Sequence, residues 1–162
     1  MNGMKKMFFF LLCAALATTA CSDSDADDET GQNGTNSLVT ASTFKATGRM
    51  TVAGNEPFVK EDVNAEVVLG NNQSAEIRIY GVSFSARMPV TIDMVIPNVT
   101  YNKTVQQITL TGDNIIPMAG GNAYERYMVS GLQGTITADS LIISNNYSNI
   151  PTVYRGKIML AE

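Results

Sequence analysis

From residue 43 onwards, apolar and polar residues alternate along short segments of the chain. In "FKATGRMTV" (44–52), apolar or small residues occupy every second position and polar residues lie between them. This period of two is typical of strands with one buried face. Because no long stretch has helical spacing, we expect an all-β domain over residues 43–162. The same alternation predicts strands at 63–69, 75–85, 90–96, 107–111, 123–129, 132–138, 141–144 and 154–160.

Glycine, proline and polar clusters mark the expected breaks in this pattern. The alternation changes phase at Gly81, with Phe84 inward beyond it, so a β-bulge is expected there. Pro97 is expected to end the strand 90–96 or to mark a sheet edge, because proline lacks the N–H that a ladder needs. The polar segment "NNYSN" (145–149) is expected to form a loop before the last strand.

Three of the predicted strands carry a glycine on the inward face, at Gly48, Gly134 and Gly156. Inward glycines let strands coil tightly, as they do in small closed barrels. The first and last strands both have one, so we expect them to pair and close the sheet. The sequence therefore predicts a single antiparallel up-and-down β-barrel of about eight strands, with a β-sandwich as the alternative. Charged residues such as Glu66 and Arg78 at outward positions exclude a barrel that spans a membrane.

The predicted barrel interior contains no charged residue. A filled interior is expected, because an apolar stripe is usually core, and a ligand held inside would be apolar and uncharged. Tyr154 supplies the only hydroxyl of the predicted inward set. That set includes Phe44, Met50, Val67, Ile77, Ile79, Ile92, Met94, Ile96, Ile136, Tyr154, Ile158 and Leu160.

The first twenty residues have a different organisation. Two lysines precede an unbroken apolar run at 7–17, which is too short to span a bilayer and is typical of a secretory signal. Small residues then lead to Cys21, and the segment resembles a bacterial lipobox, in which the cysteine is acylated and becomes the first mature residue. Thr18 departs from that pattern, because leucine is commonest there. The alternative is a plain secretory signal with an incidental cysteine. Loss of residues 1–20 would leave Cys21 without a disulfide partner in the chain.

Residues 21–42 are rich in Asp, Ser, Gly, Asn and Thr, so they are predicted to form a disordered tether. Alternate aspartates resemble the start of an EF-hand loop, but Asp28 and Gly34 stand where that loop needs glycine and glutamate. No calcium site is therefore expected. The serine and acid cluster after the cysteine instead resembles the surface-export signal of lipoproteins in the Bacteroides group, which implies a lipid anchor in the outer membrane and exposure at the cell surface. This cluster consists of Ser22, Asp23, Asp25, Asp27, Asp28 and Glu29.

Charge and composition limit the partners and the catalytic or metal sites that the chain can have. Loss of the signal segment would leave nine basic and fifteen acidic residues, and five of the acids lie in the tether. The domain is thus nearly neutral, which disfavours a nucleic-acid partner. The chain has no histidine, so Ser-His-Asp, Cys-His and His-ligated metal sites are excluded. Isolated acids such as Asp93, Asp113 and Asp139 are expected on turns and strand faces rather than as a catalytic pair. We expect no enzyme activity, no metal and no cofactor.

Two further features are candidates for recognition. Asp139-Ser140-Leu141 resembles the O-glycosylation motif of the Bacteroides group, which makes Ser140 a candidate sugar site. A group of tyrosines with interleaved arginines is a candidate stacking surface for sugars or a peptide, and cross-strand pairs on the sheet exterior are the alternative. The group consists of Tyr80, Tyr124, Tyr127, Tyr147, Tyr154, Arg78 and Arg126.

The chain resembles the calycin-like (lipocalin-like) β-barrel proteins of Bacteroides. The phrases that carry this resemblance are "TFKATGRMTV", "MVIPNVTY", "ITLTGDN", "GLQGTITADSLII" and "YRGKIML". The lipocalin Gly-x-Trp hallmark is absent, and the chain has no tryptophan. Two functions fit. The first is a surface-anchored, non-catalytic binding module for a small apolar molecule, a glycan or a protein partner. The second is a structural or accessory subunit of an outer-membrane assembly, with no ligand of its own.

Overall fold

The structure, a computed structural model, describes residues 38–54 and 56–159. Cys21, the cluster at 22–29 and Leu160 lie outside the described residues. Within that part of the chain, no helix is long and apolar enough to cross a bilayer. The elements are β1 (Thr43–Val52), β2 (Phe58–Leu69), β3 (Ser74–Val82), β4 (Ile92–Lys103), β5 (Ile108–Gly112), β6 (Met118–Ala119), β7 (Asn122–Ala123), the 3-10 helix η1 (Glu125–Tyr127), β8 (Val129–Ile136), β9 (Ser140–Tyr147) and β10 (Ile150–Met159).

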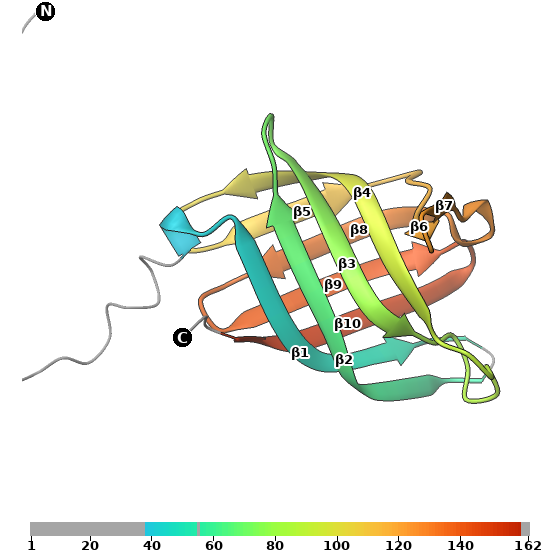
Figure 1. Cartoon of the computed structure of the whole chain (residues 1–162). Coiled ribbons are helices and arrows are strands. Elements are labelled where there is room, and N and C mark those ends of the chain that lie inside the picture. The colour runs from blue at the N-terminus through green and yellow to red at the C-terminus, as the bar shows by residue number, and fades with distance from the viewer. Residues whose placement is uncertain (1–37, 55, 160–162) are drawn as a thin grey trace, which may run out of the picture. The chain divides into compact units, whose positions relative to one another are not determined.

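The strands form a closed antiparallel barrel, as Figure 1 shows. Each long strand pairs with the next long strand along the chain, and β10 pairs with β1. The eight strands of the barrel are β1 to β5 and β8 to β10. The short β6–β7 hairpin follows β5 and precedes β8 along the chain. It pairs with β4 through Met94 and Ala119. The predicted all-β, up-and-down barrel is confirmed, and the sandwich alternative is excluded.

The barrel closes where two glycines face each other. Gly48 in β1 is the direct partner of Gly156 in β10. A Cβ atom at Gly48 would overlap the Arg155 carbonyl and the Gly156 backbone, so only glycine allows the first and last strands to approach this closely. The register between β1 and β2 also shifts between Gly48 and Met50, which marks a bulge at the same level. The predicted pairing of first and last strands is therefore confirmed.

The inward side chains form a single buried cluster inside the barrel. Ile92 and Ile158 are only partly buried, and both pack against this cluster. Sequence reasoning missed several inward residues, among them Val99 and Leu141. The predicted inward residues that are buried are Phe44, Met50, Val67, Ile77, Ile79, Met94, Ile96, Ile136 and Tyr154.

The predicted strand 90–96 is wrong at both ends. Val90 is 65% exposed and lies in the loop before β4, whereas β4 continues through Pro97 to Lys103. The chain passes the proline because Asn98 takes a positive φ of 56°. This irregularity resets the alternation, so that Val99 is buried three positions after the buried Ile96.

Two other segments differ from the prediction. The segment 123–129 is not one strand, because it contains the end of β7, the helix η1 and the first residue of β8. The segment 145–149 is not all loop, because β9 continues to Tyr147 and the turn is limited to 148–149. Asn145 and Tyr147 therefore point inward, and Tyr154 is not the only hydroxyl inside the barrel.

The meander gives the barrel two distinct ends. The entry end holds residues 38–42 and the β2–β3, β4–β5 and β8–β9 turns, and the far end holds the other connections. In Figure 1 the short helical segment at 38–40, in cyan, and the β6–β7 hairpin lie at opposite ends. Leu38 is 1% exposed, and Lys103 Nζ donates to the Ala41 carbonyl at 2.9 Å. The packed chain thus includes residues 38–42, which the sequence pattern placed in the tether.

Candidate functional site

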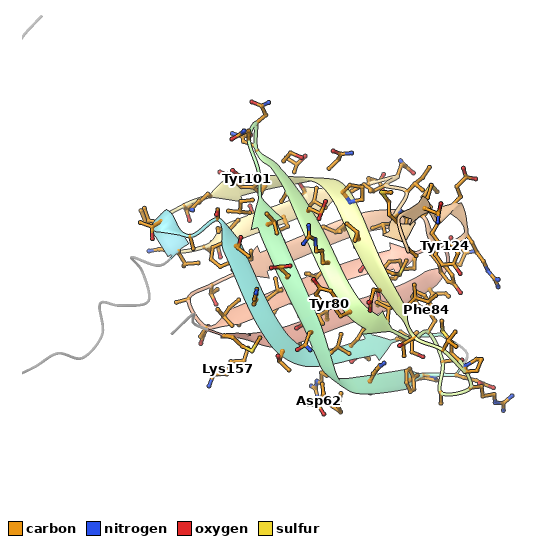
Figure 2. All side chains as sticks on the ribbon, in the orientation of Figure 1. Asp62, Tyr80, Phe84, Tyr101, Tyr124 and Lys157 are labelled. Carbon is orange, nitrogen blue, oxygen red and sulfur yellow. The ribbon has the colours of Figure 1, made fainter. Side chains whose placement is uncertain are left out.

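Aromatic rings gather at the far end of the barrel. The rings of Phe84 and Tyr127 stack with centroids 4.4 Å apart and an interplanar angle of 13°. Tyr147 contacts Phe84 edge-on at 5.1 Å, and Tyr124 lies 5.1 Å from Tyr127. Such geometries are the favoured arrangements of aromatic pairs. Figure 2 shows Phe84 and Tyr124 at this end of the molecule.

A bulge in β3 positions Phe84. Gly81 has a φ of 67°, and the register between β3 and β4 shifts between Ile79 and Val82. The Gly81 N–H donates to Asp93 Oδ1 at 2.7 Å, and Lys60 Nζ donates to the Gly81 carbonyl at 2.5 Å. The bulge predicted from the sequence is therefore confirmed, and it directs Phe84 over the barrel interior.

The β5–β8 connection supplies the other two tyrosines. Ser148, in the β9–β10 turn, holds this connection through two hydrogen bonds. Its Oγ donates to the Arg126 carbonyl at 2.6 Å, and its N–H donates to the Met128 carbonyl at 2.7 Å. These contacts fix η1, so Tyr124 and Tyr127 stay half-buried above the core. The Arg126 guanidinium lies 5.7 Å from the centroid of the Tyr127 ring, within cation–π range.

Polar side chains lie beneath these rings, inside the barrel. Thr152 Oγ1 donates to Asn145 Oδ1 at 3.1 Å and lies 3.2 Å from the Asn145 carbonyl. Asn145 Nδ2 and Tyr147 Oη meet no strict hydrogen-bond geometry with the described residues. The Asn145 side chain nevertheless lies close enough to interact with the Tyr147 hydroxyl. Burial raises the pKa of the Tyr147 hydroxyl above its usual range, and the nearby Asn145 side chain offsets part of that rise.

Exposed apolar side chains also lie in the far-end connection. Ile116 and Met128 are 42% and 39% exposed, and Met118 is 36% exposed. They belong to the same connection as Tyr124 and Tyr127, between β5 and β8. The connection between β5 and β8 thus carries exposed apolar side chains as well as two tyrosines.

The other predicted stacking residues lie elsewhere. Tyr80 is on the outer face, where its hydroxyl donates to Glu66 Oε2 at 3.2 Å, and Glu66 also pairs with Arg78 at 3.4 Å. Tyr154 is inside, and its hydroxyl lies 3.0 Å from the Ala46 carbonyl and 3.2 Å from the Val63 carbonyl. The prediction that these tyrosines and arginines form one surface is therefore wrong in part. Tyr80 and Arg78 meet at Glu66 on the outer face, whereas Tyr124, Tyr127 and Arg126 come together at the far end.

The isolated carboxylates accept hydrogen bonds from backbone N–H groups or from a nearby hydroxyl. Asp93 accepts from Gly81, and Asp113 Oδ1 accepts from the Gly131 N–H at 2.9 Å. Asp139 accepts from Thr137 Oγ1 at 2.7 Å, and this hydrogen bond lowers the pKa of its carboxyl. Within the described ranges, no three acidic, cysteine or histidine side chains are grouped to hold a metal ion.

Ser140, the candidate sugar site, begins β9 at the entry end. Its Oγ lies 2.7 Å from Thr137 Oγ1, and the residue is half-buried. A sugar on Ser140 would have to replace this hydrogen bond. Modification of Ser140 stays a prediction.

Sequence reasoning missed Asn145 as an interior residue and assigned Tyr147 only to the stacking surface. The signal was present, because Leu141, Ile143, Asn145 and Tyr147 continue one period of two. The polar composition of 145–149 masked it.

Comparison with known proteins adds no relative. No protein-family model, no curated protein and no solved structure gives a match.

Proposed function

We propose that the protein is a lipid-anchored, surface-exposed and non-catalytic binding module that captures its ligand at the far end of the barrel. The eight-stranded antiparallel barrel is compatible with a calycin-like fold. The lipobox-like segment at Cys21 and the acid cluster support membership of the calycin-like lipoproteins of the Bacteroides group.

One observation carries the proposal: the aromatic rings of Phe84, Tyr124 and Tyr127 gather at the end opposite to the entry of the chain. A tether joined to the entry end leaves the far end free to meet a ligand. The barrel interior is occupied by its own core, so glycans and peptides would contact the outside of Tyr124 and Tyr127. Aromatic faces and an adjacent arginine suit that kind of contact.

Methionine methyl groups provide reporters at both ends of the barrel. Met118 and Met128 lie at the far end, and the half-exposed Met159 lies at the entry end. In ¹³C-methyl NMR spectra of the full chain, we would titrate 1-pentanol, a cello-oligosaccharide and a tyrosine-rich peptide. We expect one of these classes to give saturable shifts of Met118 and Met128 that leave Met159 unchanged. Shifts that appear first at Met159, or no saturable shift with any class, would contradict the proposal.

An accessory role in an outer-membrane assembly is the second candidate. The exposed Ile116, Met118 and Met128 favour it, because apolar side chains at a free end also suit a protein contact. A photo-crosslinking residue at position 118 would then give one product of defined mass in intact cells. The same residue at position 159 is the matched control and should give none.

A further inference from the structure

A groove of about 310 Å³ lies on the outer face of the barrel, away from the aromatic rings of the far end. It crosses β10, β1, β2 and β3, which are neighbours in the sheet, and Tyr80 stands on its β3 side (Figure 2). The groove is lined by Lys45, Asn64, Ala65, Glu66, Tyr80 and Met159.

Glu66 is the only acid of this lining, and both of its carboxylate oxygens face groups of the chain. Oε2 accepts from the Tyr80 hydroxyl at 3.2 Å and from Arg78 Nη1 at 3.4 Å. Oε1 lies 3.9 Å from Lys45 Nζ, and the Glu66 side chain is only 14% exposed. Because Glu66 and Lys45 are the only charged residues of the lining, the groove has no net charge. A charged ligand would be attracted by one of them and repelled by the other.

The free polar groups of the lining are donors. Asn64 Oδ1 accepts from Thr47 Oγ1 at 2.7 Å, which leaves Asn64 Nδ2 without a partner among the described residues. Lys45 is 64% exposed, and its ammonium carries three N–H donors. A ligand hydroxyl would bring a proton that needs an acceptor of its own, whereas a carbonyl only accepts. An uncharged carbonyl is therefore the group that complements this lining.

Apolar groups flank these donors. Tyr80 and Met159 are 40% and 50% exposed. Met159 Sδ lies 3.4 Å from Thr47 Oγ1, the same hydroxyl that contacts Asn64, so the thioether lies beside the amide. Tyrosine rings and flexible methionine side chains both suit contacts with C–H and methyl groups. The complementary ligand thus carries an apolar group next to its carbonyl.

We propose that this groove binds the acetamido group of an N-acetylated sugar. The carbonyl oxygen accepts from Asn64 Nδ2 and Lys45 Nζ, and the methyl group contacts Met159. The sugar ring presents its C–H face to Tyr80. The groove is at the lower limit of ligand-pocket volumes, so it holds one such unit. This site is separate from the far end and does not rest on the proposed function.

A peptide carbonyl is the competing source of the same chemistry. Extended peptides gain affinity by adding a strand to a free sheet edge. Here β1, β2 and β3 each pair with a neighbouring strand on both sides, so the groove offers no such edge. An N-acetylated sugar needs only the side chains of the lining, which favours it over a peptide.

The Met159 methyl group lines the groove and reports binding directly. In ¹³C-methyl NMR spectra of the full chain, N,N′-diacetylchitobiose should shift the Met159 signal saturably and leave Met118 and Met128 unchanged. Cellobiose is the matched control ligand, because it has hydroxyl groups in place of the acetamido groups, and it should give no saturable shift. Equal shifts with both sugars would overturn the acetamido assignment. Shifts at Met118 or Met128 in place of Met159 would overturn the groove as the site.

Two substitutions test the contacts. Tyr80→Ala removes the ring, and Asn64→Asp replaces the Nδ2 donor with an acceptor of the same shape. Each should weaken the binding of N,N′-diacetylchitobiose about ten-fold, the typical effect of losing one such contact. Val59→Ala is the matched control, because Val59 is 48% exposed on β2 outside the groove, and it should bind as the wild type does. The signals of the buried Met50 and Met94 show whether each variant is folded. Wild-type affinity in folded Tyr80→Ala and Asn64→Asp would overturn the site.

Two further outcomes separate the alternatives. An N-acetylated alanine peptide that shifts Met159 with the affinity of N,N′-diacetylchitobiose would overturn the sugar in favour of a peptide. A response of Met159 to N,N′-diacetylchitobiose, together with failure of the titration at Met118 and Met128, would overturn the proposed function and leave this groove standing.

Discussion

At the scale of single residues, the two buried tyrosines differ in what their hydroxyls contact. The Tyr154 hydroxyl contacts the Ala46 and Val63 carbonyls, which lie on β1 and β2. It therefore ties β10 to two neighbouring strands across the closure of the barrel. The Tyr147 hydroxyl has no such contact within the described residues.

Replacement of Tyr154 by phenylalanine should lower the free energy of unfolding by about 0.5–1.5 kcal/mol, which is the net value of a typical buried hydrogen bond. Urea denaturation followed by far-UV circular dichroism measures it. Tyr80→Phe is the matched control, because the Tyr80 side chain is 40% exposed on the outer face and should change stability by less than about 0.5 kcal/mol. Equal effects of the two substitutions would contradict the role assigned to Tyr154.

The buried tyrosines also make stability depend on alkaline pH. Burial raises the pKa of Tyr154 to about 12 from the ordinary value of 10.0, and it raises the pKa of Tyr147 as well. Below pH 10 both the folded and the unfolded chains keep these protons. The contribution of the two tyrosines to the free energy of unfolding is therefore fully present there. Above pH 10 the unfolded chain releases protons that the folded chain retains. Each tyrosine therefore lowers the free energy of unfolding by about 1.4 kcal/mol per pH unit in that window.

We expect the denaturation midpoint to stay flat to about pH 9 and to fall from about pH 10. Tyr147→Phe should make this fall less steep, since one linked proton is lost. The measurement is a series of urea titrations between these pH values and pH 12. If the midpoint falls with pH equally steeply in the wild type and in Tyr147→Phe, Tyr147 does not contribute to the pH dependence of stability.

At the scale of elements, the closure of the barrel depends on the contact between Gly48 and Gly156. We expect Gly48→Ala to destabilise the protein by at least about 2 kcal/mol, because the added Cβ meets backbone of the closing strand rather than a flexible side chain. Gly54→Ala is the control, since nothing lies within 4 Å of a Cβ there, and it should stay within about 0.5 kcal/mol. Thermal unfolding of both variants gives the comparison, and a tolerated Gly48→Ala would mean that the strands separate at little cost.

Most of the barrel could be predicted because, in a strand with one buried face, the alternation of apolar and polar residues shows which side chains point inward. The alternation at 44–52 and the phase change at Gly81 both correspond to observed geometry. Pro97 misled the prediction because its effect depends on the next residue. Asn98 accepts a positive φ, and the strand resumes with Val99 inward. That compensation is a backbone property which alternation alone does not reveal.

The candidate site was less predictable for a different reason. Phe84, Tyr127 and Tyr147 lie on three separate connections or strands, and only the closed meander brings their rings together. Asn145 was hidden because a polar residue facing the core breaks the rule on which strand prediction depends. Its side-chain oxygen accepts a hydrogen bond from Thr152, which lies directly opposite in the β9–β10 pairing. Tertiary pairing, not local pattern, creates this part of the site.

At the scale of the whole molecule, the proposed function requires the predicted anchor as well as the far end. We expect Cys21 to be the first mature residue, with a diacylglycerol thioether and an N-acyl chain. Each buried methylene contributes about 0.8 kcal/mol, so more than one long chain gives stable attachment whereas a single chain is marginal. Mass spectrometry of the native N-terminal peptide measures this, and Cys21→Ala should leave the precursor unprocessed or release the protein. An unmodified Cys21, or processing at another residue, would contradict the anchor.

Surface exposure is the condition that lets the far end meet an external ligand. The acid cluster after Cys21 is the predicted routing signal, so alanine at Asp23, Asp25, Asp27, Asp28 and Glu29 should keep lipidation but hold the protein at the periplasmic face. Protease shaving of intact cells distinguishes the two locations, with a known surface protein as the positive control. The wild type should be cut and the alanine variant protected, while both are cut after cell lysis. A wild-type protein that resists shaving while the control is cut would place the far end in the periplasm, where only periplasmic ligands or partners could reach it.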